Sequence, residues 1–241
     1  MSRTNDGEAM IRAARNGDKD KVLEYLNSGV SIESTDQYGN TALARACDSG
    51  SVELITCLLE RKANVNPVNQ SKCSPIHGAC LGGNADVAEC LIKYGVPLNM
   101  ASSQGNRPLH FAALHCKERL LSLLLANGAD PTLTNEDGEN FLDAVKQGSN
   151  RNKAAVMHPL YSQCAALSFD QGRLLLHVSL VKDTYSWLED IQYILKSNVK
   201  AIRTKDPVTG LYPFQLAAVK KIQLDASFEL LKEAPYLLMK N

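Results

Sequence analysis

The 241-residue sequence lacks the local signatures that mark common classes of enzyme. It contains no G-x-S-x-G nucleophile elbow, no H-E-x-x-H zinc motif, no G-x-x-x-x-G-K-[ST] phosphate loop and no G-x-G-x-x-G dinucleotide turn. Carboxylates are plentiful, but no motif places two of them together in a closed pocket. We therefore expect no catalytic residue, no cofactor and no bound metal, and we expect that the protein is not an enzyme.

The sequence also lacks an excess of charge and any long apolar run. Lys plus Arg equals Asp plus Glu at 26 each, so net charge does not favour nucleic acid or an acidic membrane as a partner. No apolar run approaches the length of a membrane span, and the start MSRTNDGEAM contains no signal-peptide core. We expect a protein of the cytoplasm, the nucleus or both, monomeric on its own, with no nucleic-acid or membrane partner.

What the sequence does contain is a string that recurs with a fixed period. T-A-L-A-R-A-C, S-P-I-H-G-A-C and R-P-L-H-F-A-A begin at Thr41, Ser74 and Arg107, so the interval is 33 residues, twice in succession. Gly50 and Gly83 keep the same interval. A period of this length, with a start like T-P-L-H-x-A, resembles the repeat of the ankyrin family.

This resemblance implies an all-α solenoid of stacked helix-turn-helix units, with about five clear repeats and two degenerate C-terminal ones. In one repeat we expect Thr41 to cap a first helix over 42–48, followed by a second helix over 52–61 with one apolar face. Pro75 and Pro108 suit the first turn of a helix, where a missing N–H costs no hydrogen bond. No single repeat buries enough apolar surface to fold alone, so neighbouring repeats must stack.

The domain boundaries follow from the register of the repeats. Ankyrin repeats one to five are expected over 1–148, as an opening cap at 1–34, repeats at 35–67, 68–100 and 101–133, and the start of a fifth at 134–148. The remainder, 149–241, is expected to hold the irregular end of the fifth repeat and degenerate ankyrin-like units or a cap. Within it we expect repeat-like starts at 172 and 210, a helix over 187–197 after an insertion near 181–187, and a closing helix over 225–234. Pro159 is expected to interrupt the second helix of the fifth repeat.

The resemblance assigns structural roles to residues that otherwise suggest chemistry. His77 and His110 occupy the His of the T-P-L-H motif, where the family uses the imidazole to hydrogen-bond the loops of adjacent repeats. This structural role is favoured over acid-base chemistry.

The seven cysteines are interpreted in the same frame. Cys47 and Cys80 share one helix position, and Cys57 and Cys90 share another. Stacked helices lie about 8–10 Å apart, which is too far for a disulfide, so we expect core thiols. Cys73 lies in a turn where the family exposes its side chain, and three roles stay open for it: a partner contact, a reactive thiol or a simple surface cysteine.

The family's concave wall of turn tips and first helices commonly binds protein partners. Leu81 and Leu114 are one repeat apart on that wall and are predicted to form an exposed apolar step, with Tyr38 beside it. Apolar and aromatic anchors inside a polar rim are typical of a protein-binding hot spot. The alternative is that a neighbouring loop covers the leucines. The other residues predicted to contact the partner are His115, Gln37, Asn40, Asp48, Gln70, Cys73, Gln104, Asn106, Glu136 and Asp137.

We therefore predict a non-catalytic protein-interaction module that binds a protein partner through the concave face of an ankyrin stack, as an adaptor, inhibitor or assembly factor. Two alternatives stay open. One is a structural subunit of a large complex, held by its convex or C-terminal face, and the other is an enzyme with a site in 149–187. A basic stretch over 196–221, offset only by Asp206, is interpreted as a solvated face.

Overall fold

The computed structural model describes residues 3–114, 117–147, 153–164, 173–181, 190–219 and 230. They belong to two units, one of Met1–Asp130 with Thr134–Ser149 and one of Pro131–Leu133 with Asn150–Asn241. The regular elements in these ranges are helices, and the only bridge between extended residues joins Thr35 to Thr41. The expected all-α fold is confirmed. None of the described helices is long and apolar enough to cross a bilayer.

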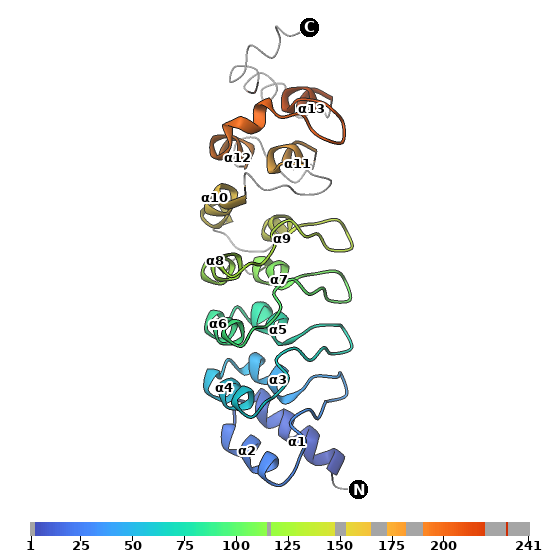
Figure 1. Ribbon diagram of the computed structural model, residues 1–241, viewed down its shortest axis with the longest axis vertical. Helices are drawn as coiled ribbons and strands as arrows, with labels where there is room; N and C mark the ends of the chain where they lie inside the picture. The colour runs from blue at the N-terminus through green and yellow to red at the C-terminus, as the bar shows by residue number, and fades with distance from the viewer. Residues whose placement is uncertain are drawn as a thin grey trace. The chain divides into compact units, whose positions relative to one another are not determined.

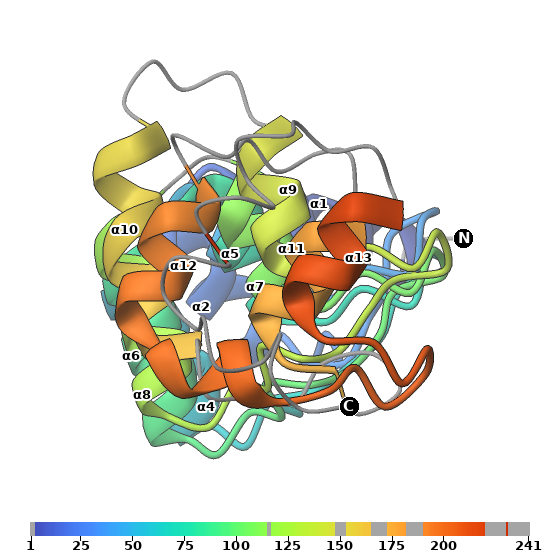
Figure 2. The ribbon, with the colours of Figure 1, turned by 90° about the horizontal axis from the view of Figure 1, so that it is seen from above.

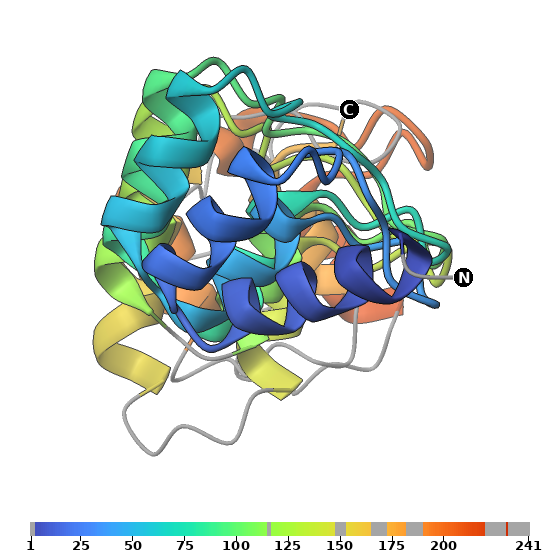
Figure 3. The ribbon, with the colours of Figure 1, turned by 90° about the horizontal axis from the view of Figure 1, so that it is seen from below.

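The first unit is a stack of helix pairs. Its inner helices are α1 (Arg3–Arg15), α3 (Ala42–Ser49), α5 (Pro75–Gly82), α7 (Pro108–Leu114) and α9 (Phe141–Gln147). Its outer helices are α2 (Lys19–Asn27), α4 (Val52–Glu60), α6 (Ala85–Lys93) and α8 (Glu118–Ala126). Each inner helix packs against the next inner helix, and α4, α6 and α8 also pack in order. Figure 1 shows these two columns, with the turns projecting beside the inner one, and Figure 3 shows α1 and α2 at the N-terminal end of the unit.

Local sequence sets the ends of the inner helices. The Thr41 hydroxyl accepts the main-chain N–H of Ala44 at 3.4 Å, which caps α3 as expected. At the start of α5, Ser74 and His77 form a capping box, and Pro75 occupies the first helical position. Gly50 ends α3 with φ 76°, a left-handed conformation that costs glycine little.

The outer helices supply large apolar side chains to the core between the two columns. Leu54, Ile55 and Leu58 of α4 are fully buried, and Leu91 of α6 lies one repeat beyond Leu58 and is also fully buried. Because each helix pair presents apolar surface to the pair before it and the pair after it, the burial of one repeat depends on both of its neighbours.

Successive turns are joined by the same main-chain hydrogen bond, repeated every 33 residues. The donors are the N–H groups of Gln70, Ser103 and Glu136, and the acceptors are the carbonyls of Tyr38, Ser71 and Gln104, at 3.1, 2.8 and 3.2 Å. This close approach leaves no room for a side chain at Gly105, where a Cβ would lie 2.7 Å from the main-chain nitrogen of Glu136. The turns therefore form a continuous hydrogen-bonded edge beside the inner helices.

The second unit repeats the two-layer pattern within its described residues. It contains α10 (Lys153–Cys164), α11 (Leu175–Val181), α12 (Gln192–Ser197), the 3-10 helix η3 (Val199–Arg203) and α13 (Pro213–Val219). Helix α11 packs against α13, and α10 packs against α12 (Figure 2). Both α11 and α13 begin within the repeat-like strings that start at 172 and 210.

The predicted interruption at Pro159 is wrong, because α10 continues through this residue. The proline is exposed, while Val156, Leu160 and Tyr161 are buried on the other side of the helix. We attribute the continuity to this buried face, which offsets the one missing main-chain hydrogen bond. Of the helix predicted over 187–197, the described part includes α12 (Gln192–Ser197), whereas 187–189 lie outside the described residues. The predicted insertion, from 182 onward, and the closing helix at 225–234, apart from Leu230, lie outside the described residues.

Asp206 does not offset the basic stretch at the surface, as the sequence had indicated, because its side chain is fully buried. Arg173 donates to its carboxylate from Nε at 2.8 Å and from Nη2 at 3.1 Å, and the Thr209 hydroxyl donates at 2.6 Å. Burial opposes ionisation of Asp206, but these hydrogen bonds outweigh it and lower the pKa to about 2. Asp206 therefore joins its own turn to the segment that precedes α11.

Replacing Leu91 by Ala is expected to lower the free energy of unfolding of the chain by about 2–5 kcal/mol, because it removes a fully buried side chain between two repeats. The same replacement at Leu81, which is 52% exposed, should change it by less than about 0.5 kcal/mol. Urea denaturation followed by circular dichroism measures both values. Equal losses would contradict the assignment of Leu91 to the core.

Replacing Lys72 by Gly is expected to raise the free energy of unfolding by about 0.5–1 kcal/mol. Lys72 has φ 55°, at the turn position where Gly39, Gly105 and Gly138 have φ 81°, 76° and 73°. A lysine in this left-handed conformation is strained, whereas glycine adopts it freely. The same urea titration measures the gain, and an unchanged or lower stability would show that the lysine side chain compensates for the strain.

Candidate functional site

A hollow of about 340 Å³ opens on the inner face of the first unit. Turn residues, including Tyr38 and Cys73, form one side of it, and residues of α3, α5 and α7 form the other. Gly78 and Leu81 of α5 and Phe111 of α7 lie along the helical side. We call this hollow the inner groove.

The inner groove arises from two positions of the repeat that share one helix face. The first position is occupied by Arg12, Arg45, Gly78 and Phe111, and the second by Arg15, Asp48, Leu81 and Leu114. The two positions are three residues apart, so their side chains lie next to each other on each inner helix. Because Gly78 has no side chain, the space between Arg45 and Phe111 stays open and forms the floor of the groove.

Tyr38, Leu81 and Leu114 are exposed, with fractional exposures of 56%, 52% and 38%. No loop among the described residues covers the two leucines. Within this part of the chain, the alternative that a neighbouring loop buries them is therefore excluded. Tyr38 and Leu81 line the inner groove, whereas Leu114, at the end of α7, does not. The apolar surface of the groove is completed by Phe111, which meets the His77 ring edge-to-face with 5.6 Å between ring centres.

The two motif histidines have the structural role expected of them. Nδ1 of His77 accepts the N–H of Ser74 at 3.1 Å, and Nδ1 of His110 accepts the N–H of Arg107 at 3.2 Å. Nε2 therefore carries the proton in each ring. It donates to the carbonyl of Met100 at 3.1 Å from His77 and to that of Glu139 at 3.0 Å from His110. Burial lowers the pKa of both imidazoles, and each ring ties its helix start to the following loop as a neutral group.

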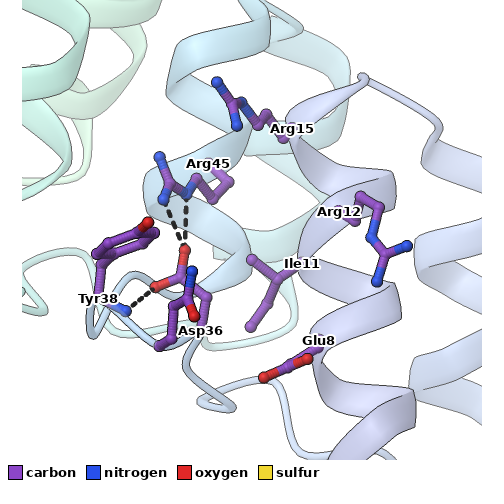
Figure 4. Close-up of a pocket in the computed structure, with 8 residues that line it drawn as sticks. Glu8, Ile11, Arg12, Arg15, Asp36, Tyr38 and Arg45 are labelled. Carbon is purple, nitrogen blue, oxygen red and sulfur yellow. Dashed lines mark hydrogen bonds and ion pairs between the residues drawn. The ribbon is translucent and has the colours of Figure 1, made fainter.

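An ion-pair cluster forms the polar rim next to Tyr38. Arg45 donates to the Asp36 carboxylate from Nε at 2.9 Å and from Nη2 at 2.7 Å (Figure 4). It also donates to Asp48 at 3.2 Å. Burial opposes ionisation of Asp36, but hydrogen bonds from the N–H groups of Asn40 and Tyr38 and from Arg45 keep its pKa below the usual range. The charge of Arg45 is therefore balanced within the protein.

A second hollow, of about 230 Å³, adjoins the first on the side of α1. Glu8, Ile11, Arg12 and Arg15 of α1 line this hollow, and Figure 4 shows Glu8 and Ile11 on the side of α1 nearest Asp36 and Tyr38 and the Arg12 side chain extending away from them. We call it the arginine hollow. Tyr38 and Arg45 line both hollows, so the two are neighbours on one surface.

The turn-tip asparagines differ from expectation. Asn40 is buried rather than exposed, because its amide donates to Asp36 and its carbonyl oxygen accepts the amide of Asn69 at 2.9 Å. Asn106, which holds the same repeat position two repeats later, is half-buried and accepts the amide of Asn135 at 3.1 Å. Both residues bridge successive turns, which leaves their amides little capacity to bind a partner.

The other predicted contacts fall into three groups. Cys73 is half-buried on the wall of the inner groove, and burial raises the pKa of its thiol, which disfavours a reactive thiolate. His115 lies outside the described residues. The remaining predicted contacts are exposed: Gln37, Asp48, Gln70, Gln104, Glu136 and Asp137.

Sequence reasoning missed the residues at the first of the two groove positions, of which Phe111, Arg45 and Gly78 shape the inner groove. A signal was present, because they precede the predicted position by three residues and share its helix face. Among the described residues, no group of three or more His, Cys, Asp or Glu side chains is placed to hold a metal ion. The surface is therefore a groove with an apolar centre and a charged rim.

Comparison with known proteins agrees with the repeat pattern. A family model described as ankyrin repeats, in three copies, matches residues 2–69 and 54–135, which together cover more than half of the chain. No curated protein matches the chain.

The free energy of unfolding is expected to fall as the pH is lowered through the ordinary histidine pKa of 6.5. The folded-state pKa of His77 and His110 lies below that value, so the unfolded chain binds protons that the folded chain does not, and stability is full only above pH 6.5. Thermal melts between pH 7.5 and 5 measure the change, with a His77→Gln, His110→Gln variant as the control. The melting temperature of the variant should depend much less on pH than that of the wild type. An unchanged pH dependence would assign the effect to other groups.

Proposed function

Because this chain belongs to the ankyrin repeat family, we propose that it is a non-catalytic protein-interaction module that binds a protein partner through the inner groove. Ankyrin repeats are generally protein-interaction modules, and the family is generally non-enzymatic. Within that class we propose an adaptor, inhibitor or assembly factor. The observation that carries the proposal is the apolar centre of the groove, where Leu81 and Phe111 flank the floor at Gly78.

The energetics of the groove support this proposal. Tyr38 and Leu81 each expose more than half of their surface to water, although both are large side chains. Complete burial of such a side chain contributes about 1.5–3 kcal/mol, so covering the groove stabilises a complex. Hydrogen-bonded polar groups surround this apolar centre, as at the binding hot spots of other proteins.

We also propose that the protein acts in the cytoplasm, the nucleus or both. Cys47 and Cys80 are free thiols in the core, and burial raises the pKa of both, so they remain protonated. Reduced core thiols suit a reducing compartment. Fluorescence microscopy of the tagged full chain tests this placement, and secretion of the tagged chain would contradict it.

Replacing both Leu81 and Leu114 by Glu is expected to abolish partner binding, because each carboxylate would be buried without a counter-charge in the complex. Both side chains are exposed in the free protein, so helix content and melting temperature should hardly change. Partners are captured on the tagged wild-type chain from cells that express it, identified by mass spectrometry, and then measured against the purified variants.

Two controls accompany this experiment. Val52→Glu with Tyr94→Glu makes the same change at exposed apolar residues of the outer layer and should leave binding intact. Leu58→Glu places a charge in the core and should unfold the repeat. If the folded Leu81→Glu, Leu114→Glu variant keeps its partner, the inner groove is not the binding surface, and attachment through another face, as for a structural subunit, takes its place.

A further inference from the structure

The inner face of the first unit changes its chemistry in one direction along the stack. At the two groove positions, α1 carries Arg12 and Arg15, α3 carries Arg45 and Asp48, α5 carries Gly78 and Leu81, and α7 carries Phe111 and Leu114. The turn tips carry no acidic side chain in the second and third turns, where Lys72 is the one charged residue, and become acidic in the last, at Glu136 and Asp137. The face is therefore cationic at α1, apolar at α5 and α7, and anionic at the turn before α9.

From this order we infer that the partner presents an extended peptide segment with acidic, apolar and basic side chains in that sequence. The acidic side chains pair with Arg12 and Arg15, the apolar side chain enters the inner groove, and the basic side chains lie over the acidic turn. The inference rests on the proposed function and specifies the chemistry of its partner.

The cationic end is available to a ligand. Arg12 and Arg15 are exposed on the wall of the arginine hollow, and neither forms an ion pair with a described residue. Arg45 differs, because Asp36 and Asp48 neutralise it. Glu8 is the one acidic residue that α1 contributes to the hollow, so the α1 wall keeps an excess of positive charge. Guanidinium groups bind carboxylates through paired, charge-assisted hydrogen bonds, which makes Asp and Glu the fitting ligands.

The inner groove is small. Its volume of about 340 Å³ is near the lower end of the range for ligand pockets, about 300–1,000 Å³, and suits one large side chain rather than a folded surface. Gly78 forms its floor, and Leu81 and Phe111 form its apolar walls. This geometry favours an extended segment that inserts one anchor.

The anionic end lies in the turn before α9, within the same unit. Glu136 and Asp137 are exposed, and their carboxylates form no ion pair with a described residue. A Lys or Arg side chain of the partner would supply the opposite charge, whereas an acidic one would be repelled. The two charged ends therefore specify that the acidic end of the segment lies over α1 and its basic end over the turn before α9.

The spacing of the repeats sets the spacing within the segment. Inner helices lie about 8–10 Å apart, so α1 and α5 are separated by about 16–20 Å and α1 and α9 by about 32–40 Å. An extended chain advances by about 3.3–3.6 Å per residue. The acidic side chains should therefore precede or follow the apolar anchor by about five or six residues, with the basic side chains about the same distance beyond it.

The test is selection of random 14-residue peptides, displayed on phage, against the purified full chain. The wild type should enrich peptides with Asp or Glu about five residues from a large apolar residue, and with Lys or Arg on the other side of it. Arg12→Glu with Arg15→Glu should remove the acidic preference and weaken binding of the best wild-type peptide by about tenfold or more. Gly78→Leu fills the groove floor with a better helix former and should abolish the apolar preference without loss of stability.

A matched control reverses two charges elsewhere. Arg61→Glu with Lys93→Glu changes exposed residues beside the outer helices and should leave the selected peptides unchanged. If the Arg12→Glu, Arg15→Glu variant melts at a lower temperature than the wild type, Arg12→Gln with Arg15→Gln is used in its place. This variant should also bind the best wild-type peptide more weakly.

Two outcomes overturn the inference. One is that no peptide is enriched, and the other is that the enriched peptides bind the Arg12→Glu, Arg15→Glu variant as well as the wild type. Failure of the inference is distinguishable from failure of the proposed function. If the Leu81→Glu, Leu114→Glu variant loses its captured partner while the arginine variants keep it, the groove binds a partner of different charge order. If all of these variants keep the partner, both proposals fail.

Discussion

The main-chain hydrogen bond that joins each turn to the next holds the binding surface in register. It recurs at the same atoms from Tyr38 to Glu136, one bond for each pair of neighbouring turns. Because the bond joins main-chain atoms, each turn must lie directly over its neighbour, and a Cβ at Gly105 would lie 2.7 Å from the next turn's backbone. The inner helices follow the turns, so residues 33 apart in the sequence lie side by side on one face.

Equivalent geometry does not produce equivalent chemistry along this face. The same helix position holds arginine at 12 and 45, glycine at 78 and phenylalanine at 111. The backbone keeps these positions aligned, so a different residue type in each repeat changes the surface without disturbing the stack. Glycine in the middle of a helix costs about 0.5–1 kcal/mol relative to alanine, and at Gly78 the same residue opens the floor of the groove.

The histidines and asparagines of the repeat stabilise the stack, whereas other residues form the surface that a partner can contact. His77 and His110 are polar residues in the repeat motif, yet both are buried and bonded to the loop that follows them. Asn40 and Asn106 join successive turns through their side-chain amides. Polar residues at these positions therefore stabilise the edge of the stack, and the contact surface is left to the turn tips and the inner helix faces.

The sequence by itself determined the architecture of the first unit. The 33-residue period, the caps at Thr41 and Ser74 and the helix-start prolines are local signals, and a local signal does not depend on distant packing. The exposure of Leu81 and Leu114 also followed from register alone. These features were predictable because each repeat is in contact mainly with its two neighbours.

Only the tertiary structure decided which polar side chains are buried and paired with other groups of the protein. Asn40 is buried because the next turn brings Asn69 within hydrogen-bonding distance, and Asp206 is buried against Arg173, which lies 33 residues before it in the sequence. The buried face of α10 likewise carries the helix through Pro159. Exposure and pairing depend on the atoms that a neighbouring element brings close, and composition and spacing do not specify those atoms.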